Sequence, residues 1–341
     1  MSLTSEVAIT PMAFAQAIVA AYGRYGQDPA SALQRARITP ESLKDPHNRI
    51  TGSQMQILFG IAIQELNDEA LGWFSRRLPW GSYGMLCRAT LGSPTLEVAL
   101  KRWCRYHGLL TDDITLRFTQ TSTAATIAIQ VNRDLGEMTE FCFATLFRYI
   151  LGYACWAINS RIPLLEACFP FDAPDHLGVY QMLFPGPLHF RADGARISFD
   201  PQYAALPIRR DDQALSKMLQ HALPLTMFPY RRDRLLVQRV RDYLKTRPDG
   251  LHTGESIAKE FHVSPRTLHR QLQEEGASLQ AIKDEVRRDR AIELLNKTGR
   301  PIKQVALAVG FLSEKSFSRA FKQWTGMTPE ALREMGRHFV S

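Results

Sequence analysis

The sequence predicts an α+β domain followed by an all-α domain with two helix-turn-helix units joined by a long linker helix. Three observations lead to this fold class: positive charge confined to the last third, a change of hydrophobic period, and an internal repeat. The 341 residues suffice for two domains. Residues 231–341 carry 22 Lys and Arg against 14 Asp and Glu, a net charge of +8, whereas residues 1–230 carry 20 of each. This asymmetry predicts a polyanion partner for the last third, with a basic solvated face as the alternative.

The composition is that of a globular protein with a buried core, since 45% of the residues are hydrophobic and 22% are charged. The five cysteines are odd in number, lie in apolar surroundings and form no C-x-x-C pair. We therefore expect reduced, buried thiols in a cytoplasmic protein, and neither a disulfide framework nor a zinc site. The first residues show no secretory signal pattern.

The first domain is expected to begin with several helices in residues 11–78. Within them, residues 13–26 place apolar side chains at helical spacing and stop at glycine. Residues 93–108 form the clearest helix, with Ser93 as the predicted N-cap and Gly108 at the end.

The hydrophobic period then changes to two, which is typical of strands. Residues 113–120 and 125–132 predict a β-hairpin. An apolar helix is expected over 137–158, and residues 187–200 predict a second hairpin around Asp193-Gly194. The first two-thirds of the chain therefore predict a mixed α+β domain.

The helix over 137–158 contains the longest apolar run of the chain, which Arg148 interrupts. The run only just reaches the length of a membrane span. We expect a buried helix of a globular domain and no membrane partner.

The composition changes around residues 224–234, where two prolines interrupt the helical pattern and the first basic cluster begins. We therefore expect one domain over residues 1–225, a linker over 226–234 and a second domain over 235–341.

The last third contains a repeat, with one copy at residues 255–276 and the other at 305–326. The matched pairs, at an offset of 48 or 49 residues, are Ile257-Ala258 with Val305-Ala306, Ser264 with Ser313, Leu268 with Phe317, Arg270 with Arg319, and Leu272 with Phe321. One extra residue lies in the turn of the second copy.

Each copy has the features of a helix-turn-helix. A small residue, Ala258 or Ala306, allows a close helix approach, and Gly310 suits a tight turn in the second copy. A serine caps the second helix. Apolar residues four apart bury one face of that helix and leave the other polar. The polar faces carry Arg266, His269 and Arg270 in the first copy, and Glu314, Lys315, Ser318 and Arg319 in the second.

Between the copies, residues 278–298 predict a helix capped at Ser278. About 19 helical residues span roughly 28 Å, and one turn of B-DNA is about 34 Å. Such a helix could set two recognition helices into successive major grooves. The alternative is a pair of helical hairpins that pack on each other with solvated outer faces.

The second copy and the linker helix together carry a specific pattern. The residues are Ile302, Val305-Ala306, Gly310-Phe311, Ser313, Ser316-Phe317, Arg319, Phe321-Lys322, Gly326, Thr328-Pro329 and Arg333, with Arg287, Ala291 and Leu294-Leu295 in the linker helix. This pattern resembles the DNA-binding domain of the AraC/XylS family of bacterial transcription regulators, over about residues 235–335.

The resemblance implies a seven-helix domain that binds double-stranded promoter DNA. It also implies that the protein acts as an activator, with RNA polymerase as a further partner. The base-contact candidates that it implies are Arg266, Thr267, His269, Arg270, Glu314, Lys315, Ser318 and Arg319.

The first domain resembles, more loosely, the arabinose-binding-type sensor domain of a longer subgroup of this family, typified by ornithine-utilisation regulators. The matching stretches are SPTLEVALKRWCRYHGLL, HLGVYQMLFPGPLHF and ISFDPQYAALPI. This resemblance implies a small-molecule effector and a homodimer.

The first domain shows no catalytic set at informative spacing, no phosphate-binding glycine loop, and no pattern for a metal or cofactor. Arg148 is the best pointer to an effector pocket, because a buried guanidinium needs a partner and a carboxylate would serve. The alternative is that Arg148 forms an internal salt bridge or lies on an exposed stripe of the helix. Trp156 is the second effector candidate, since it can line an apolar cavity, although Trp80, Trp103 and Trp156 are all expected in the core.

These patterns predict a DNA-binding transcription regulator and no enzyme. One competing function is a metabolite-processing enzyme fused to a DNA-binding domain. Another is an architectural DNA binder without sequence preference.

Overall fold

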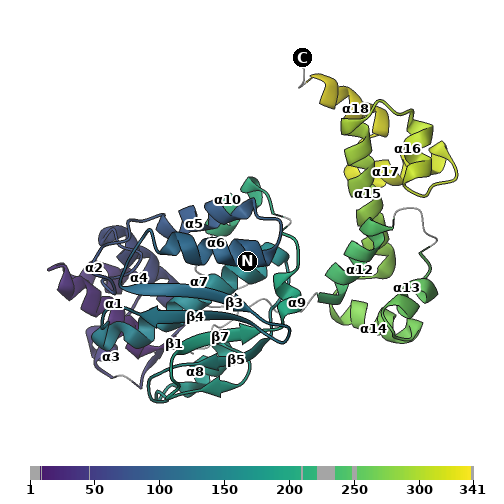
Figure 1. Ribbon diagram of the computed structural model, residues 1–341. Coiled ribbons are helices and arrows are strands. Elements are labelled where there is room, and N and C mark those ends of the chain that lie inside the picture. Colours follow the sequence, from purple (N-terminus) through teal and green to yellow (C-terminus); the bar gives the residue numbers. More distant parts are fainter. Residues whose placement is uncertain are drawn as a thin grey trace. The chain divides into compact units, whose positions relative to one another are not determined.

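A computed structural model describes residues 8, 10–45, 47–208, 210–220, 235–247 and 252–338 of the chain. The chain forms two compact units, residues 1–233 and 234–341 (Figure 1). The linker expected over 226–234 lies outside the described residues. Each unit is described by itself below.

Unit 1 is built on a five-stranded sheet in the strand order β3-β4-β7-β5-β6. The expected hairpin of β3 and β4 is confirmed, with Ile114 opposite Val131 at its open end. Alternate residues of β4 are buried, so one face of the sheet forms core. The strands are β3 (Ile114–Gln120), β4 (Ala125–Val131), β5 (Leu164–Cys168), β6 (Leu188–His189) and β7 (Ala195–Phe199), and a separate two-stranded sheet pairs β1 (Thr10–Pro11) with β2 (Arg49–Ile50).

The prediction of a second hairpin around Asp193-Gly194 is wrong. Strands β6 and β7 flank this turn but do not pair, because β5 lies between them in the sheet. β5 runs antiparallel to β7 and parallel to β6. β5, which comes earlier in the chain, therefore pairs with the edge of β7 that β6 would have occupied in a local hairpin.

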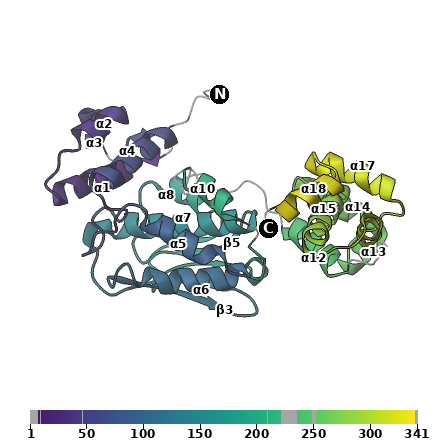
Figure 2. The ribbon, with the colours of Figure 1, turned by 90° about the horizontal axis from the view of Figure 1, so that it is seen from above.

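In unit 1, helices α5, α6 and α7 lie on one side of this sheet (Figure 1). α6 packs against β3 and α5 packs against α6 (Figure 1), while α1 to α4 gather at one end of the unit (Figure 2). The helices are α1 (Met12–Arg24), α2 (Ala30–Arg35), α3 (Pro40–Lys44), α4 (Gly52–Glu65), α5 (Ser82–Leu91), α6 (Leu96–His107), α7 (Thr139–Ile158), α8 (Leu177–Leu183), α9 (Pro201–Ala204) and α10 (Asp212–Leu219), with a 3-10 turn at Gly136–Met138.

Helix α7, with the 3-10 turn before it, is the one helix among the described residues that is long and apolar enough to cross a membrane. Of its most apolar stretch, 89% is buried inside the protein. Burial of this kind is typical of a core helix. All five cysteines of the chain are buried, and none of them forms a disulfide.

Two local expectations for unit 1 need correction. The N-cap of α6 is Thr95, whose hydroxyl accepts from the backbone N–H of Val98 at 3.4 Å, and the expected cap Ser93 lies before the helix. The Ser93 hydroxyl instead accepts from Arg102 at 3.0 Å. Trp80, expected in the core, is 63% exposed, because it lies in the loop before α5.

Unit 2 consists of helices throughout its described residues. Long helix α15 has α13 and α14 at one end and α16 and α17 at the other (Figure 1). The helices are α12 (Leu235–Thr246), α13 (Gly254–Glu260), α14 (Pro265–Glu274), α15 (Leu279–Lys297), α16 (Ile302–Ala308), α17 (Glu314–Thr325) and α18 (Pro329–His338).

Candidate nucleic-acid interface

Helix α14 begins at a complete N-cap. The Ser264 hydroxyl accepts from the backbone N–H of Thr267 at 3.1 Å, and Pro265 occupies the first position, where its missing N–H costs nothing. Leu268 and Leu272, one turn apart, are fully buried. The opposite side of α14 is therefore free to carry polar side chains.

Helix α17 repeats this arrangement. The Ser313 hydroxyl accepts from the backbone N–H of Ser316 at 3.1 Å. Phe317 and Phe321 are fully buried, with ring centroids 5.5 Å apart. The apolar side of α17 is thus aromatic where that of α14 is aliphatic.

The turns before the two helices differ. In the second pair Gly310 has a φ of 83°, which suits glycine. At the corresponding place in the first pair, His262 has a φ of 54°, a conformation that costs a side-chain-bearing residue free energy. The shorter turn of the first pair therefore uses the same left-handed conformation without a glycine.

Helix α15 contributes to two separate hydrophobic clusters. Ile282 packs into a cluster with α12, α13 and α14, and Ala291, Leu294 and Leu295 pack into a cluster with α16 and α17. The Ser278 hydroxyl caps α15 at 3.1 Å from the N–H of Ala281, as expected. Each helix pair thus has its own core, and α15 is common to both.

Arg287, in the middle of α15, contacts the second turn. Its guanidinium lies 5.5 Å from the centroid of the Phe311 ring. This contact anchors the turn that precedes α17 to the long helix.

Helix α12 is held by a carboxylate from the first pair. Glu275 accepts from the backbone N–H groups of Leu236 at 3.1 Å and Val237 at 2.8 Å, which satisfies donors at a helix N-terminus. Arg241 of α12 also forms an ion pair with Glu285 of α15. These contacts fix the first pair on one end of α15.

The eight residues expected to contact bases lie on α14 and α17, on the sides turned away from the two cores. Six are exposed and two, Thr267 and Ser318, are partly buried. The exposed residues are Arg266, His269, Arg270, Glu314, Lys315 and Arg319. On each helix the structure brings all four residues onto one polar side.

Two of these side chains already have partners. The Thr267 hydroxyl lies 2.8 Å from that of Ser264, so it belongs to the cap of α14. Arg270 forms an exposed ion pair with Glu274 at 3.6 Å, and a pair of this kind contributes little. Arg270 can therefore exchange Glu274 for another partner at small cost.

The helical spacing extends both polar sides by one turn, to residues that sequence reasoning left out. Gln273 follows His269 by four positions, and Lys322 follows Ser318 by four. Both are exposed. Their spacing was the signal that could have found them.

The two effector candidates of unit 1 both lie on α7. Arg148 is 3% exposed and donates to the backbone carbonyl of Leu183 at 2.8 Å. Burial lowers the pKa of its guanidinium to about 10. Trp156 is buried and lies 5.3 Å from the guanidinium of Arg210, which also donates to its carbonyl at 2.9 Å. Their role toward an effector stays a prediction.

Comparison with known proteins identifies both units. The profile of the arabinose-binding N-terminal domain of AraC transcription regulators matches residues 26–208, and that of a helix-turn-helix domain matches residues 257–335. The ornithine utilization regulator of Pseudomonas aeruginosa is 27% identical over 335 residues, 98% of each chain.

Two further proteins are similar along most of the chain. An uncharacterized HTH-type transcriptional regulator of Mycobacterium tuberculosis is 26% identical over 91% of this chain and 92% of its own. The crystal structure of the transcriptional regulator CdpR from Pseudomonas aeruginosa is 21% identical over 90% of this chain and 96% of its own, with a TM-score of 0.32. With a sheet-containing N-terminal domain of the arabinose-binding type and a helical helix-turn-helix domain after it, the chain belongs to the AraC family of DNA-binding transcription regulators.

Proposed function

We propose that α13–α14 and α16–α17 are two helix-turn-helix units joined by α15, and that α14 and α17 each read a major groove of promoter DNA. The observation that carries this proposal is the repeated construction: two serine-capped helices, each buried on one side and polar on the other. Both lie in the part of the chain that holds the whole net positive charge. Capped helices with exposed basic side chains are typical of major-groove readers.

The residue types on these helices suit different parts of DNA. Arg270 and Arg319 can donate two hydrogen bonds to the O6 and N7 acceptors of guanine, and Glu314 can accept from the amino group of cytosine. Arg266 and Lys315, near the helix starts, suit phosphates or bases, and Thr267, His269 and Ser318 add shorter polar contacts. The extended sides add Gln273 and Lys322.

The length of α15 supports two contacts on one face of the duplex. Its 19 residues span about 28 Å, close to the roughly 34 Å of one DNA turn. Because the two cores are separate, each helix pair packs independently at one end of this helix. Two successive major grooves are therefore the proposed target.

For unit 1 we propose effector binding and dimerisation in the cytoplasm, without turnover of the effector. An effector can change transcription only if it binds one state of the protein more tightly than the other. Activation through contact with RNA polymerase is the proposed output. Arg148 and Trp156 are the effector contacts that the sequence suggests.

The test is selection of binding sites from a random duplex library, followed by footprinting of the full chain. We expect selected sites with two conserved blocks about one turn apart, and affinity that falls steeply with salt as phosphate contacts release counterions. A library that yields no preferred sequence would instead favour an architectural binder. A single block would contradict the two-groove proposal.

A further inference from the structure

Helix α6 presents two unsatisfied polar atoms to the interior of unit 1. Trp103 and His107 are one turn apart, so they share a side of the helix. Both are almost completely buried, and Trp103 Nε1 and His107 Nδ1 have no hydrogen-bond partner among the described residues. Buried polar atoms are nearly always satisfied by protein, water or a ligand, so two such atoms on one side of a helix call for an explanation.

Aromatic rings surround these atoms. Tyr83 of α5 lies between them, with its ring centroid 6.5 Å from Trp103 and 6.0 Å from His107. From α7, Tyr149 stacks on Tyr83 at 4.8 Å and Tyr153 packs on Trp103 at 4.8 Å. Facing pairs on α6 and α7, each at a spacing of four residues, thus enclose Tyr83.

One of these residues is partly exposed to solvent. Tyr149 retains partial accessibility, although burial raises the pKa of its hydroxyl. Trp156 follows Tyr153 on the same side of α7, with the two rings 6.1 Å apart. The aromatic stripe therefore runs along α7 to the tryptophan that the sequence suggested as an effector contact.

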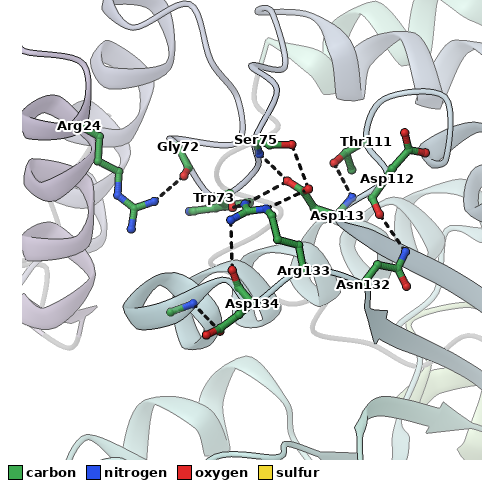
Figure 3. Close-up of polar contacts among 11 residues, drawn as sticks. Arg24, Gly72, Trp73, Ser75, Thr111, Asp112, Asp113, Asn132, Arg133 and Asp134 are labelled. Atoms are coloured by element: carbon green, nitrogen blue, oxygen red, sulfur yellow. Dashed lines mark hydrogen bonds and ion pairs between the residues drawn. The ribbon is translucent and has the colours of Figure 1, made fainter.

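A hydrogen-bonded loop borders the cluster at His107. Phe74 packs edge-on against His107 at 6.1 Å. Figure 3 shows how its neighbours are held: Arg133 donates to the carbonyl of Trp73 at 2.7 Å and pairs with Asp113, which also accepts from Ser75. The Arg133 guanidinium, hydrogen-bonded to it, keeps the pKa of the Asp113 carboxyl below its usual range. These contacts hold the loop that carries Phe74 beside His107.

We propose that the cluster of Tyr83, Trp103, His107, Tyr149 and Tyr153 is the effector site, and that it takes an uncharged planar molecule with a hydrogen-bond acceptor. The site rests on the effector role proposed for unit 1 and replaces Arg148 as the main contact, because the Arg148 guanidinium already donates to the carbonyl of Leu183. A planar ligand that enters the cluster would replace contacts between these rings with stacking of its own, and the indole N–H of Trp103, which can only donate, requires an acceptor.

The charges around the cluster favour a neutral ligand. Burial lowers the pKa of His107 to about 4, so its imidazole is neutral at pH 7. The pKa of Tyr83 and of Tyr149 is raised mainly by burial, and the carboxylate of Glu69 raises both further. That carboxylate accepts from the backbone N–H of Tyr83 at 2.8 Å. An anion would meet this negative charge after losing its water, whereas a neutral acceptor would not.

The experiment is calorimetric titration of the full chain with three probes of similar shape. Benzamide is neutral and has an acceptor, benzoate is its anionic counterpart, and toluene has no acceptor. We expect benzamide to bind at millimolar concentration or below, and benzoate and toluene to bind at least tenfold more weakly. Equal binding of benzoate or toluene, or no binding of benzamide, would overturn the proposal.

Two variants locate the binding. His107→Phe and Trp103→Phe should each weaken benzamide at least fivefold, and Trp80→Phe, at an exposed tryptophan, should leave it unchanged. His107→Phe also removes the 3.5 Å contact between His107 Nε2 and the Tyr83 hydroxyl, so its melting temperature is measured beside that of Trp103→Phe, which removes only an indole N–H without a partner. Benzamide binding that neither variant weakens would also overturn the proposal.

Binding of each variant to a selected DNA site distinguishes failure of the effector site from failure of DNA reading. If the chain binds DNA normally but does not bind benzamide, this site is refuted and the proposed reading of DNA still stands. Benzamide binding that does not change affinity for DNA by at least twofold refutes the cluster as an effector site, because an effector must be coupled to the output.

Discussion

The two helix pairs of unit 2 share one construction and differ in how each is stabilised. The first has a short turn with His262 in the left-handed region and an aliphatic core of Leu268 and Leu272. The second has a longer turn with Gly310 and an aromatic core of Phe317 and Phe321. The difference shows that the cap and the buried stripe define the pair, while turn and core chemistry can vary around them.

The largest expected effect separates the two cores. Phe321→Ala should destabilise the second pair by about 3–5 kcal/mol, because it leaves a cavity among buried rings. Hydrogen exchange should then accelerate in α16 and α17 and stay slow in α13 and α14, since the clusters are separate. Leu272→Ala, expected to cost about 2–5 kcal/mol, should give the reverse pattern. Acceleration in both pairs from either variant would show one cooperative core.

The next effect concerns the polar sides. Arg319→Ala and Arg270→Ala should each weaken binding to a selected site by about 1–3 kcal/mol, with little change on unrelated DNA. Lys297→Ala, which removes an exposed charge paired with Glu293 on α15, is the charge-matched control. An equal loss with this control would mean that the arginines supply charge alone.

The two turns should respond differently to substitution. Gly310→Ala should cost about 1–2 kcal/mol because a Cβ is strained at positive φ. The new Cβ would lie 3.6 Å from the Arg287 guanidinium, an ordinary contact, so strain and not a clash sets this cost. His262→Gly should be close to neutral, since relief of the same strain offsets the added flexibility of the unfolded chain. Urea titration followed by circular dichroism measures both, and equal losses would contradict the assignment.

The smallest effect should be the same in both pairs. Ser264→Ala and Ser313→Ala each remove an N-cap and should cost about 1 kcal/mol. Threonine at either position should restore most of this free energy, because it can accept the same hydrogen bond. The melting temperatures of the two alanine variants measure this effect. If one variant lowers the melting temperature more than about twice as much as the other, the caps are not equivalent.

Local patterns made much of this fold predictable. Unit 2 follows from its repeat, because the serines, the turn glycine and the apolar pairs act within one or two helical turns. The hairpin of β3 and β4 is likewise a local feature with strict alternation. The eight candidate contacts lie on the expected helices for the same reason.

Features that depend on distant residues were missed. Strand β5 lies between β6 and β7 in the sheet, and no sequence pattern around Asp193-Gly194 predicts this position. The loop after α4 is organised by Asp68, which is fully buried and accepts from the backbone N–H groups of Ala70, Gly72 and Leu78. Such a carboxylate looks like any surface acid in the sequence. The unsatisfied atoms of Trp103 and His107 became visible only with their neighbours in place.

The most direct test of two-groove reading is an affinity map of one selected site, measured for the parent chain, Arg270→Ala and Arg319→Ala. Every base pair is changed in turn and the loss of affinity is recorded. We predict that each variant becomes indifferent to base changes in one block only, and that the two blocks lie about ten base pairs apart. Loss of discrimination at the same block in both variants, or at neither block, would contradict the proposal that α14 and α17 read successive major grooves.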